Sequence, residues 1–419
     1  MAEPTVVIIG AGQAGLQVAV TLRERRYEGR IVLIGDEIHP PYRRPPLSKG
    51  YLLGEATEAQ VVLCQDSYFT QHRIELITGK RVVAIDRARR MVALDDDSVI
   101  EYEHLVLATG ARNRPLPVQG AELENVFFLR TRDEADALRE RMPNAKHAVV
   151  IGAGFIGLEF ASCAAKKDLD VTVLEVADRP MARVISKAMS AVFAREHVKH
   201  GVKLLISTQA MRLLGEGGKV SGVETVDGRI LPADLVVIGI GVIPNVELAA
   251  TCDLAIEDGV VVDEHLQTGD PSISAIGDVA AHPNPYGHGP RIRLESVQNA
   301  CDQARNVANR ITGKPAVYDA LPWFWTNQGD LKLQLAGLPR TGCEEVVRGD
   351  PNGTAFSVFL FHDGRLVAVE SLNRPPEHLL ARRLLSSRVA ITPQQAADTS
   401  FDLKKLLPAQ PSAAATTAG

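Results

Sequence analysis

The sequence predicts an α/β protein that contains one strand–turn–helix–strand unit twice and ends in a different, α+β segment. In the first unit an apolar strand, Val6–Ile9, runs into a glycine-rich turn at 10–15, and a helix and a second strand follow. The same order recurs between residues 147 and 174. Beyond residue 320, apolar and polar residues alternate, which indicates an antiparallel sheet. The length of 419 residues also favours more than one domain.

The boundaries of each unit follow from the apolar pattern. The first helix is expected to extend to about Arg26, and the second strand to cover Arg30–Ile34. In the second unit the strands are expected at Ala148–Ile151 and Asp170–Leu174, with a helix between them that ends near Lys167. Two copies at this separation are typical of paired Rossmann-like dinucleotide-binding domains, because a solenoid would repeat at a much shorter period.

Each glycine turn has the spacing G-x-G-x-x-G, follows a strand and opens a helix, which makes it a dinucleotide fingerprint. The first glycine permits the tight turn, the second lets a pyrophosphate approach the backbone, and the third allows close helix–strand packing. The helix N-terminus adds positive potential for the phosphates. These glycines are Gly10, Gly12 and Gly15 in the first unit and Gly152, Gly154 and Gly157 in the second.

An acidic residue follows the second strand of each unit, where it can accept hydrogen bonds from an adenosine ribose. In the first unit this acid is Asp36 or its neighbour Glu37. In the second it is Glu175, which favours the free 2′-hydroxyl of NADH over the phosphate of NADPH. Further along, Arg179 and Arg183 either contact the pyrophosphate or remain surface charges.

Other strand-to-glycine turns connect the two units. They are expected at Glu103–Gly110, Ala233–Gly241 and Ser274–Asp278, with a linker at Ala111–Pro117 and a long helix from about Ser296 to Arg310.

The final segment is expected to form strands and one helix. The strands are expected at Lys332–Ala336, Phe356–Phe361 and Leu366–Val369, and the helix at about Glu377–Ser387. Residues 406–419, rich in small residues, are expected to be disordered.

Composition narrows the class of protein. Apolar residues make up 45% and charged residues 23%, as in a soluble globular protein, and the net charge of −5 argues against a nucleic-acid binder. A strand begins almost at once, without the features of a signal peptide, and no stretch reaches the length of a membrane span. A cytoplasmic location without membrane association is therefore expected.

The cysteines carry no recognisable redox or metal spacing. They are scattered, so neither a disulfide framework nor a metal site is predicted, and Cys163, within an apolar helical pattern, is expected to be a buried, inert thiol. The cysteines are Cys64, Cys163, Cys252, Cys301 and Cys343.

Two dinucleotide sites in one chain indicate electron flow between two cofactors. With the paired glycine turns, the motifs Ala108–Gly110 and Ile276–Asp278 resemble the two-dinucleotide-binding flavoprotein superfamily that includes glutathione reductase. That resemblance implies FAD in the first unit, with Asp278 on its ribityl chain. The disulfide and peroxidase branches carry a redox cysteine where this chain has Pro41–Tyr51, which contains none. The thiol branch is therefore excluded.

Five shorter motifs resemble the oxygenase-coupled ferredoxin reductases of the putidaredoxin-reductase type. The resemblance extends to about residue 405. The motifs are Arg44–Lys49, Leu129–Thr131, Glu295–Ala300, Pro322–Trp325 and Asn373–Pro375.

The resemblance implies a fold of two Rossmann-like dinucleotide-binding domains plus a C-terminal α+β domain. The FAD domain, 1–112 and 244–320, is interrupted by an inserted NAD domain, 113–243, and the C-terminal domain covers 321–405.

Together with the glycine turns, the resemblance assigns the cofactor contacts. The FAD set is Gly10, Gly12, Ala14, Gly15, Asp36, Lys49, Val82, Ala108, Arg130, Gly277, Asp278, Val297 and Trp325. The NAD set is Gly152, Gly154, Ile156, Gly157, Glu175, Arg183 and Gly241.

Three residues are expected to act in catalysis: Lys49, Glu159 and Trp325. By resemblance, Lys49 lies beside the flavin and pairs with Glu159, since an unpaired buried lysine would be costly. Glu159 could instead complement the dipole of its own helix. Trp325, with Trp323 and Phe324, either covers the flavin or lines the route to the acceptor, and the alternative is a core role.

The implied reaction takes hydride from NADH onto FAD and passes single electrons to a 2Fe–2S ferredoxin. That ferredoxin would serve a haem monooxygenase or a ring-hydroxylating dioxygenase. The helix beginning near Ser296 and Val297 would place its positive end at the flavin. Because ferredoxins are acidic, a basic docking patch is expected, and transient partnership favours a monomer. Candidate docking residues, each of which could equally be a solvated surface charge, are Arg43, Arg44, Arg291, Arg293, Arg305 and Arg310.

Three alternatives remain open from the sequence. A rubredoxin reductase would use the same cofactors and differ mainly in its docking surface. An NADH oxidase would reduce oxygen directly, although the missing cysteine argues against water formation. A non-enzymatic protein could hold FAD and NADH for a conformational, redox-sensing role.

Overall fold

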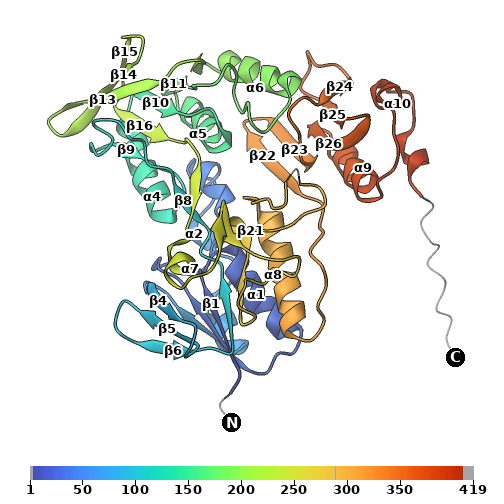
Figure 1. The fold of residues 1–419 in the computed structure, drawn as a ribbon. Helices are drawn as coiled ribbons and strands as arrows, with labels where there is room; N and C mark the ends of the chain where they lie inside the picture. The colour runs from blue at the N-terminus through green and yellow to red at the C-terminus, as the bar shows by residue number, and fades with distance from the viewer. Residues whose placement is uncertain (1–2, 288, 409–419) are drawn as a thin grey trace.

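The computed structural model describes residues 3–287 and 289–408. Its first sheet is parallel, with strand order β20-β7-β1-β2-β3. The sheet takes strands from both segments expected to form the FAD domain. The helices α1 (Gln13–Glu24) and α8 (Val297–Ile311) pack against each other beside it (Figure 1). The strands are β1 (Thr5–Ile9), β2 (Arg30–Ile34), β3 (Ile74–Ile77), β7 (His104–Leu107) and β20 (Ile273–Ala275).

The second sheet repeats this parallel design, with order β12-β11-β10-β16-β9. Its central strands are mostly apolar and buried, as in parallel sheets that helices cover. The helices α5 (Phe155–Lys166) and α6 (Lys187–Lys199) contact strands of this sheet. The strands are β9 (Val126–Phe127), β10 (His147–Ile151), β11 (Asp170–Leu174), β12 (Lys203–Leu205) and β16 (Leu235–Ile238).

The expected linker is one strand of a two-stranded antiparallel ribbon. In it β8 (Ala111–Asn113) pairs with β17 (Val242–Pro244), so the chain enters and leaves the second sheet side by side. Thr109 and Asn245 bind each other reciprocally at its base: Thr109 Oγ1 donates to the Asn245 carbonyl at 2.8 Å, and Asn245 Nδ2 to the Thr109 carbonyl at 2.9 Å. The two points at which the chain passes between the first and the second parallel sheet therefore lie side by side.

Two antiparallel three-stranded sheets were not predicted, because their short strands carry weak alternation. They are formed by β4 (Val82–Asp86), β5 (Met91–Leu94) and β6 (Val99–Glu101), and by β13 (Ala210–Glu216), β14 (Lys219–Thr225) and β15 (Ile230–Pro232).

The C-terminal segment forms the expected antiparallel sheet, with order β22-β23-β26-β25-β24. The three predicted strands are present, and two further strands, β22 and β24, complete the sheet. The expected helix is α9 (Pro375–Ser386), and a short helix, α10 (Pro393–Ala397), was not predicted. The strands are β22 (Trp323–Gln328), β23 (Leu331–Gly337), β24 (Glu344–Arg348), β25 (Phe356–His362) and β26 (Arg365–Leu372).

Shorter elements fill the connections. They are η1 (Pro45–Ser48), α2 (Glu58–Val61), α3 (Asp66–Gln71), α4 (Arg132–Arg141), η2 (Met142–Asn144), α7 (Glu247–Thr251), β18 (Ile256–Glu257), β19 (Gly259–Val261), η3 (Gly277–Val279), β21 (Ala280–Ala281) and η4 (Leu403–Leu406).

The C-terminal boundary needs one correction. Leu406 ends η4, so residue 406 belongs to the folded domain and not to the expected disordered tail. Residues 409–419 of that tail lie outside the described residues. Within residues 3–287 and 289–408, no helix has both the length and the apolar character that a membrane span requires.

Buried histidines make the stability of the fold depend on pH. Burial lowers the pKa of His104 to about 3, and that of His282 and His378 to about 4. In the unfolded chain these groups titrate near 6.5, so below that pH the unfolded state binds more protons. The neutral, buried histidines therefore contribute their full stabilisation above about pH 6.5, and the free energy of unfolding falls as the pH drops toward 4.

The variant His282→Gln tests this pH dependence. His282 is fully buried and its Nδ1 lies 3.2 Å from Gln303 Nε2, a donor that a glutamine oxygen can also satisfy. We expect the free energy of unfolding, measured with urea, to fall less between pH 7 and pH 5 in the variant. An equal fall in both proteins would contradict the assignment.

Candidate active site

The first glycine turn has the geometry of a phosphate cradle. Gly10 has φ +112°, and a Cβ there would lie 2.1 Å from the Ala108 carbonyl oxygen. A Cβ at Gly15 would lie 2.0 Å from the Gly10 carbonyl oxygen. A Cβ at Gly12, by contrast, would meet nothing within 4 Å. Two glycines are therefore required by the protein's own packing, and the third opens the space that a ligand phosphate needs.

The second turn repeats this division. A Cβ at Gly152, where φ is +105°, would lie 2.5 Å from the Gly239 carbonyl oxygen, and one at Gly157 would lie 2.1 Å from the Gly152 carbonyl oxygen. At Gly154 the nearest atom would be 3.8 Å away. Ile156, in the first turn of α5, exposes 42% of its surface at this opening. Both turns therefore fit a dinucleotide pyrophosphate.

The other expected FAD residues gather around the first turn. A Cβ at Gly277 would lie 3.3 Å from Ala14 Cβ, which places Gly277–Asp278 against the start of α1. Arg130 donates to Asp278 at 3.0 Å, and its Nη2 would lie 3.7 Å from a Cβ at Gly110. The structure thus brings Arg130 and Asp278 together beside the cradle, as an ion pair that was not predicted.

Gln303 of α8, which was not predicted, holds this turn in place. It is fully buried, and its Oε1 accepts from the Gly277 backbone N–H at 2.7 Å. The buried face of α8 also carries Gln298 and Asn299, so a polar residue at position 303 does not stand out in the sequence pattern. Val297, half-buried at the start of the same helix, lies next to the cap residue Ser296.

Val82 is 4% exposed, belongs to the apolar core of the first domain and pairs with Leu94 between β4 and β5. Its expected contact with FAD stays a prediction.

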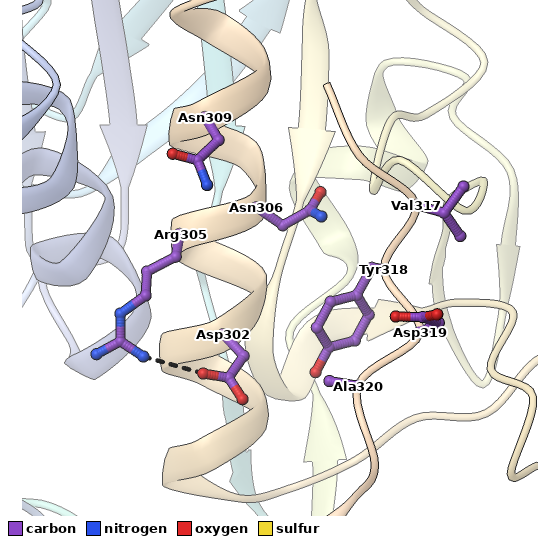
Figure 2. A pocket seen from close by; sticks show the side chains of 8 residues that line it. All are labelled: Asp302, Arg305, Asn306, Asn309, Val317, Tyr318, Asp319 and Ala320. Carbon is purple, nitrogen blue, oxygen red and sulfur yellow. Dashed lines mark hydrogen bonds and ion pairs between the residues drawn. The ribbon is translucent and has the colours of Figure 1, made fainter. Parts of the chain in front are cut away.

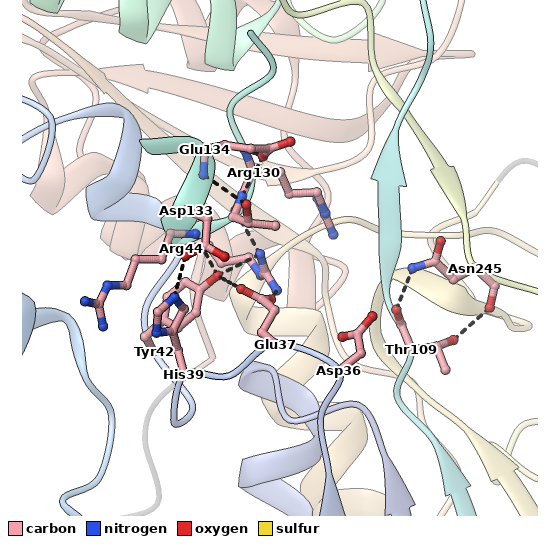
Figure 3. Close-up of polar contacts among 12 residues, drawn as sticks. Asp36, Glu37, His39, Tyr42, Arg44, Thr109, Arg130, Asp133, Glu134 and Asn245 are labelled. Atoms are coloured by element: carbon pink, nitrogen blue, oxygen red, sulfur yellow. Dashed lines mark hydrogen bonds and ion pairs between the residues drawn. The ribbon is translucent and has the colours of Figure 1, made fainter. Parts of the chain in front are cut away.

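The two acids that follow β2 have different roles (Figure 3). Glu37 accepts from Arg44 at 2.5 Å and from the Tyr42 hydroxyl, so its carboxylate is committed to protein partners. Asp36 stands apart, with its side chain 61% exposed and only Arg81 near it, at 3.4 Å. Because the Asp36 side chain is 61% exposed and that of Glu37 only 23%, exposure favours Asp36 over Glu37 as the ribose ligand.

In the second unit, Glu175 is fixed across the mouth of the glycine turn. Its two carboxylate oxygens accept from the backbone N–H groups of Ala153 and Ala177, at 2.8 and 2.9 Å. Arg183 is exposed, and its Nη2 lies 3.9 Å from the position of a Cβ at Gly241, so these two predicted residues are neighbours.

Arg179 is not a free surface charge, and its expected contact with the pyrophosphate stays a prediction. Its guanidinium donates inward, to the carbonyls of Ala182 at 2.7 Å and Ile185 at 3.0 Å. It is a structural group of the loop that follows β11.

The predicted pair of Lys49 and Glu159 is present between the two cradles. Lys49 Nζ lies 2.6 Å from Glu159 Oε2, and the Glu159 side chain is only 3% exposed. Ser48 Oγ donates to Oε2 at 2.5 Å and Thr326 Oγ1 to Oε1 at 2.6 Å. Residues from η1, α5 and β22 therefore meet at one buried carboxylate.

The dipole alternative for Glu159 is wrong. The helix α5 begins at Phe155 and has no acid in its first turn, so Glu159 lies in the second turn and points to Lys49. Ser48 and Thr326 were not predicted, because nothing in their spacing reveals that three distant segments converge.

The three aromatic residues of β22 divide between the two faces of the sheet. Phe324 is half-buried and packs against a core, on Phe155 of α5, with ring centroids 4.5 Å apart. Trp323 and Trp325 are half-buried on the opposite face, with ring centroids 5.6 Å apart. The core alternative thus holds for Phe324, and Trp325 keeps the exposure that a role at the flavin or acceptor requires.

Cys163 is buried as expected. Its Sγ lies 3.3 Å from the Ser48 carbonyl oxygen, and burial raises the pKa of the thiol to about 12, so it stays protonated.

The expected docking arginines do not form a free basic patch. Arg44, Arg291, Arg293 and Arg305 pair with Glu37, Glu257, Glu295 and Asp302. Arg310 donates to Ser274. Among the described residues, Arg43 is exposed and forms no ion pair. Glu295 and Asp302 lie within three residues of Arg293 and Arg305, whereas Glu257 lies 34 residues before Arg291. The docking role of these arginines stays a prediction.

A shallow pocket of about 240 Å³ lies along α8 (Figure 2). Asp302, Arg305 and Tyr318 line it, and none of the predicted cofactor residues does. We assign it no part in the site.

Comparison with known proteins agrees with this geometry. The family model "Pyridine nucleotide-disulphide oxidoreductase" matches residues 4–304, and "Reductase C-terminal" matches residues 323–407. Rhodocoxin reductase from Rhodococcus erythropolis is 51% identical over 96% of this chain and 93% of its own. Putidaredoxin reductase from Pseudomonas putida is 40% identical over 97% of this chain and 98% of its own.

A solved structure shows the same fold. The ferredoxin reductase for the CYP199A2 system from Rhodopseudomonas palustris superposes with a TM-score of 0.94, at 50% identity, over 96% of this chain and 100% of its own. The expected fold class and the expected resemblance are therefore confirmed. The chain belongs to the pyridine nucleotide-disulphide oxidoreductase family and carries that family model together with a reductase C-terminal domain.

Proposed function

We propose that this protein is an FAD-containing, NADH-dependent ferredoxin reductase. The single observation that carries the proposal is the buried Lys49–Glu159 pair, which lies where η1 of the first domain meets α5 of the second. FAD, when bound, accepts two electrons as hydride and can return them one at a time. A chain with two phosphate cradles and no redox cysteine pair is suited to that transfer.

The chain's own residues would place the two cofactors and tune their surroundings. The first glycine turn, Asp36 and the Arg130–Asp278 pair would hold FAD, and the second turn with Glu175 and Arg183 would hold NADH. Glu159 fixes the Lys49 ammonium at 2.6 Å, so that a positive charge stays beside the flavin position. The N-terminus of α8 adds partial positive charge on another side.

The proposed acceptor is a 2Fe–2S ferredoxin that serves a haem monooxygenase or a ring-hydroxylating dioxygenase, in the cytoplasm. Rhodocoxin reductase and putidaredoxin reductase support this acceptor class, because both align over nearly their whole length. A monomer with a transient partner is part of the proposal.

The same proposal divides the chain into an FAD domain (1–112 and 244–320), an NAD domain (113–243) and a C-terminal domain (321–405). The ribbon of β8 and β17 supports this division, since both crossings between the two parallel sheets occur there.

An anaerobic titration tests the function. We expect NADH to bleach the flavin spectrum of the purified protein, and a 2Fe–2S ferredoxin to restore it while becoming reduced. Transfer to rubredoxin or oxygen alone would replace the proposed acceptor. A colourless protein that cannot be reconstituted with FAD would overturn the proposal, and bleaching followed by no transfer would favour the redox-sensing alternative.

The preference for NADH should depend on the charge of Glu175. In Glu175→Gln the amide oxygen can accept from one of the two backbone N–H groups, while the amide nitrogen faces the other and that bond is lost. The charge that repels a 2′-phosphate is lost as well. We expect the ratio of kcat/KM for NADH over NADPH to fall about tenfold, which corresponds to roughly 1.4 kcal/mol. Steady-state assays with ferricyanide measure this ratio, and an unchanged ratio would assign the preference to another group.

A further inference from the structure

The N-terminus of α6, in the NAD domain, is capped by carboxylates from the C-terminal sheet. Glu370 of β26 is fully buried; its Oε1 accepts from the Ser186 backbone N–H at 2.8 Å and its Oε2 from Ser186 Oγ at 2.5 Å. Glu345 of β24 accepts from the next two N–H groups, those of Lys187 and Ala188, at 2.8 and 3.2 Å. Donors that a helix start leaves unpaired are thus satisfied from another domain.

Ser186 also ends the loop, residues 176–186, that borders the NADH cradle. The Met181 N–H donates to the carbonyl of Ala153, inside the second glycine turn, at 2.9 Å. Arg179 ties the carbonyl of Ile185 into the same loop. The loop is therefore held at the glycine turn on one side and by Glu370 on the other, with Arg183 between these two anchors.

Burial of the Glu370 carboxylate in the contact with Ser186 is energetically unfavourable. Burial raises the pKa of Glu370 to about 7, the two bonds from Ser186 oppose that shift, and Glu345 raises it while Arg179 lowers it. A buried carboxylate within an apolar sheet contributes little net stability compared with an apolar residue. Its geometry, aimed at one loop, points to a positioning role.

We propose that Glu370 is a positioning residue for NADH, which holds loop 176–186, and with it Arg183, against the second glycine turn. The inference rests on the proposed function, because it concerns the affinity of the same nicotinamide site. The C-terminal domain then contributes to NADH binding from outside the NAD domain, without touching the dinucleotide.

The test compares Glu370→Gln with Glu377→Gln. Glu377 is a half-buried carboxylate of the C-terminal domain, with its side chain 13% exposed, and its partners Ser357, Arg348 and Arg374 all lie within that domain. For Glu370→Gln we expect KM for NADH to rise about tenfold, as for loss of a charged hydrogen bond, with kcat for ferricyanide nearly unchanged. For Glu377→Gln we expect a lower Tm and an unchanged KM.

Two further measurements complete the test. Ser186→Ala removes the hydroxyl that donates to Glu370 and that also accepts from the Met189 N–H as the cap of α6. We expect KM for NADH to rise about threefold, and the double variant to show less than the product of the single effects. If Glu370→Gln does not fold, the KM of Ser186→Ala for NADH tests the inference instead. The FAD content of each folded variant should match the wild type.

An unchanged KM in Glu370→Gln or, where that variant does not fold, in Ser186→Ala would overturn the inference. Equal rises in Glu370→Gln and Glu377→Gln would also overturn it, because they would show general destabilisation. If NADH does not reduce the flavin of the wild type, the proposed function itself fails, which is a separate result.

Discussion

Valine at position 12 should give a folded protein that does not retain FAD. In Gly12→Val the new side chain enters the open space of the first cradle, where no protein atom lies within 4 Å. The variant should therefore fold, but a phosphate of FAD can no longer reach the backbone N–H groups of the turn. The loss of two charged hydrogen bonds, about 3 kcal/mol, lowers FAD affinity by about 100-fold. The visible absorbance of the purified protein measures how much FAD it retains, and reconstitution with FAD measures the remaining affinity.

The equivalent change in the second cradle should separate the two cofactors. In Gly154→Val the flavin spectrum should remain, but NADH should bleach it only at concentrations about 100-fold higher, for the same reason. This contrast is specific, because the two glycines occupy equivalent positions in their turns.

Gly269 provides the matched control for both variants. It is exposed, and a Cβ there also meets nothing within 4 Å, but it lies on neither cradle. Gly269→Val should bind FAD and NADH like the wild type. If Gly12→Val kept its FAD, or if Gly154→Val lost FAD as well, the assignment of one cofactor to each cradle would be wrong.

Removal of the Glu159 carboxylate should slow flavin reduction strongly. In Glu159→Ala the ammonium of Lys49, 21% exposed, loses its partner, and Ser48 and Thr326 lose their acceptor. Breaking a buried pair costs several kcal/mol, and solvent access at Lys49 reduces this to about 2 kcal/mol. If that loss appears in the transition state, stopped-flow reduction by NADH slows about 30-fold.

A second ion pair on the same helix serves as the control. Lys166 of α5 pairs with Glu55 at 2.7 Å, and both side chains are more than half exposed. Such pairs contribute little, so Lys166→Met should leave the rate unchanged. Equal rates in Glu159→Ala and the wild type would falsify the proposed role of the pair, whatever the change in Tm.

Features that depend on local pattern could be predicted from the amino-acid sequence alone. Both glycine turns, the strands Arg30–Ile34 and Asp170–Leu174, and the long helix after Ser296 follow from apolar periodicity and from turn chemistry that neighbouring residues supply. The resemblance to the ferredoxin reductases added the pairing of Lys49 with Glu159, which spacing alone does not show. The roles of the individual cofactor residues remain predictions.

Only the tertiary structure decided what depends on segments far apart in the chain. It shows that Glu37 binds Tyr42 and Arg44, whereas the side chain of Asp36 is mostly exposed. It paired Arg291 with Glu257, 34 residues away, placed Thr326 on Glu159, and set Glu370 against Ser186, 184 residues away. The physical reason is that a hydrogen bond or ion pair requires two groups within about 3 Å, whereas a local pattern describes only one of them.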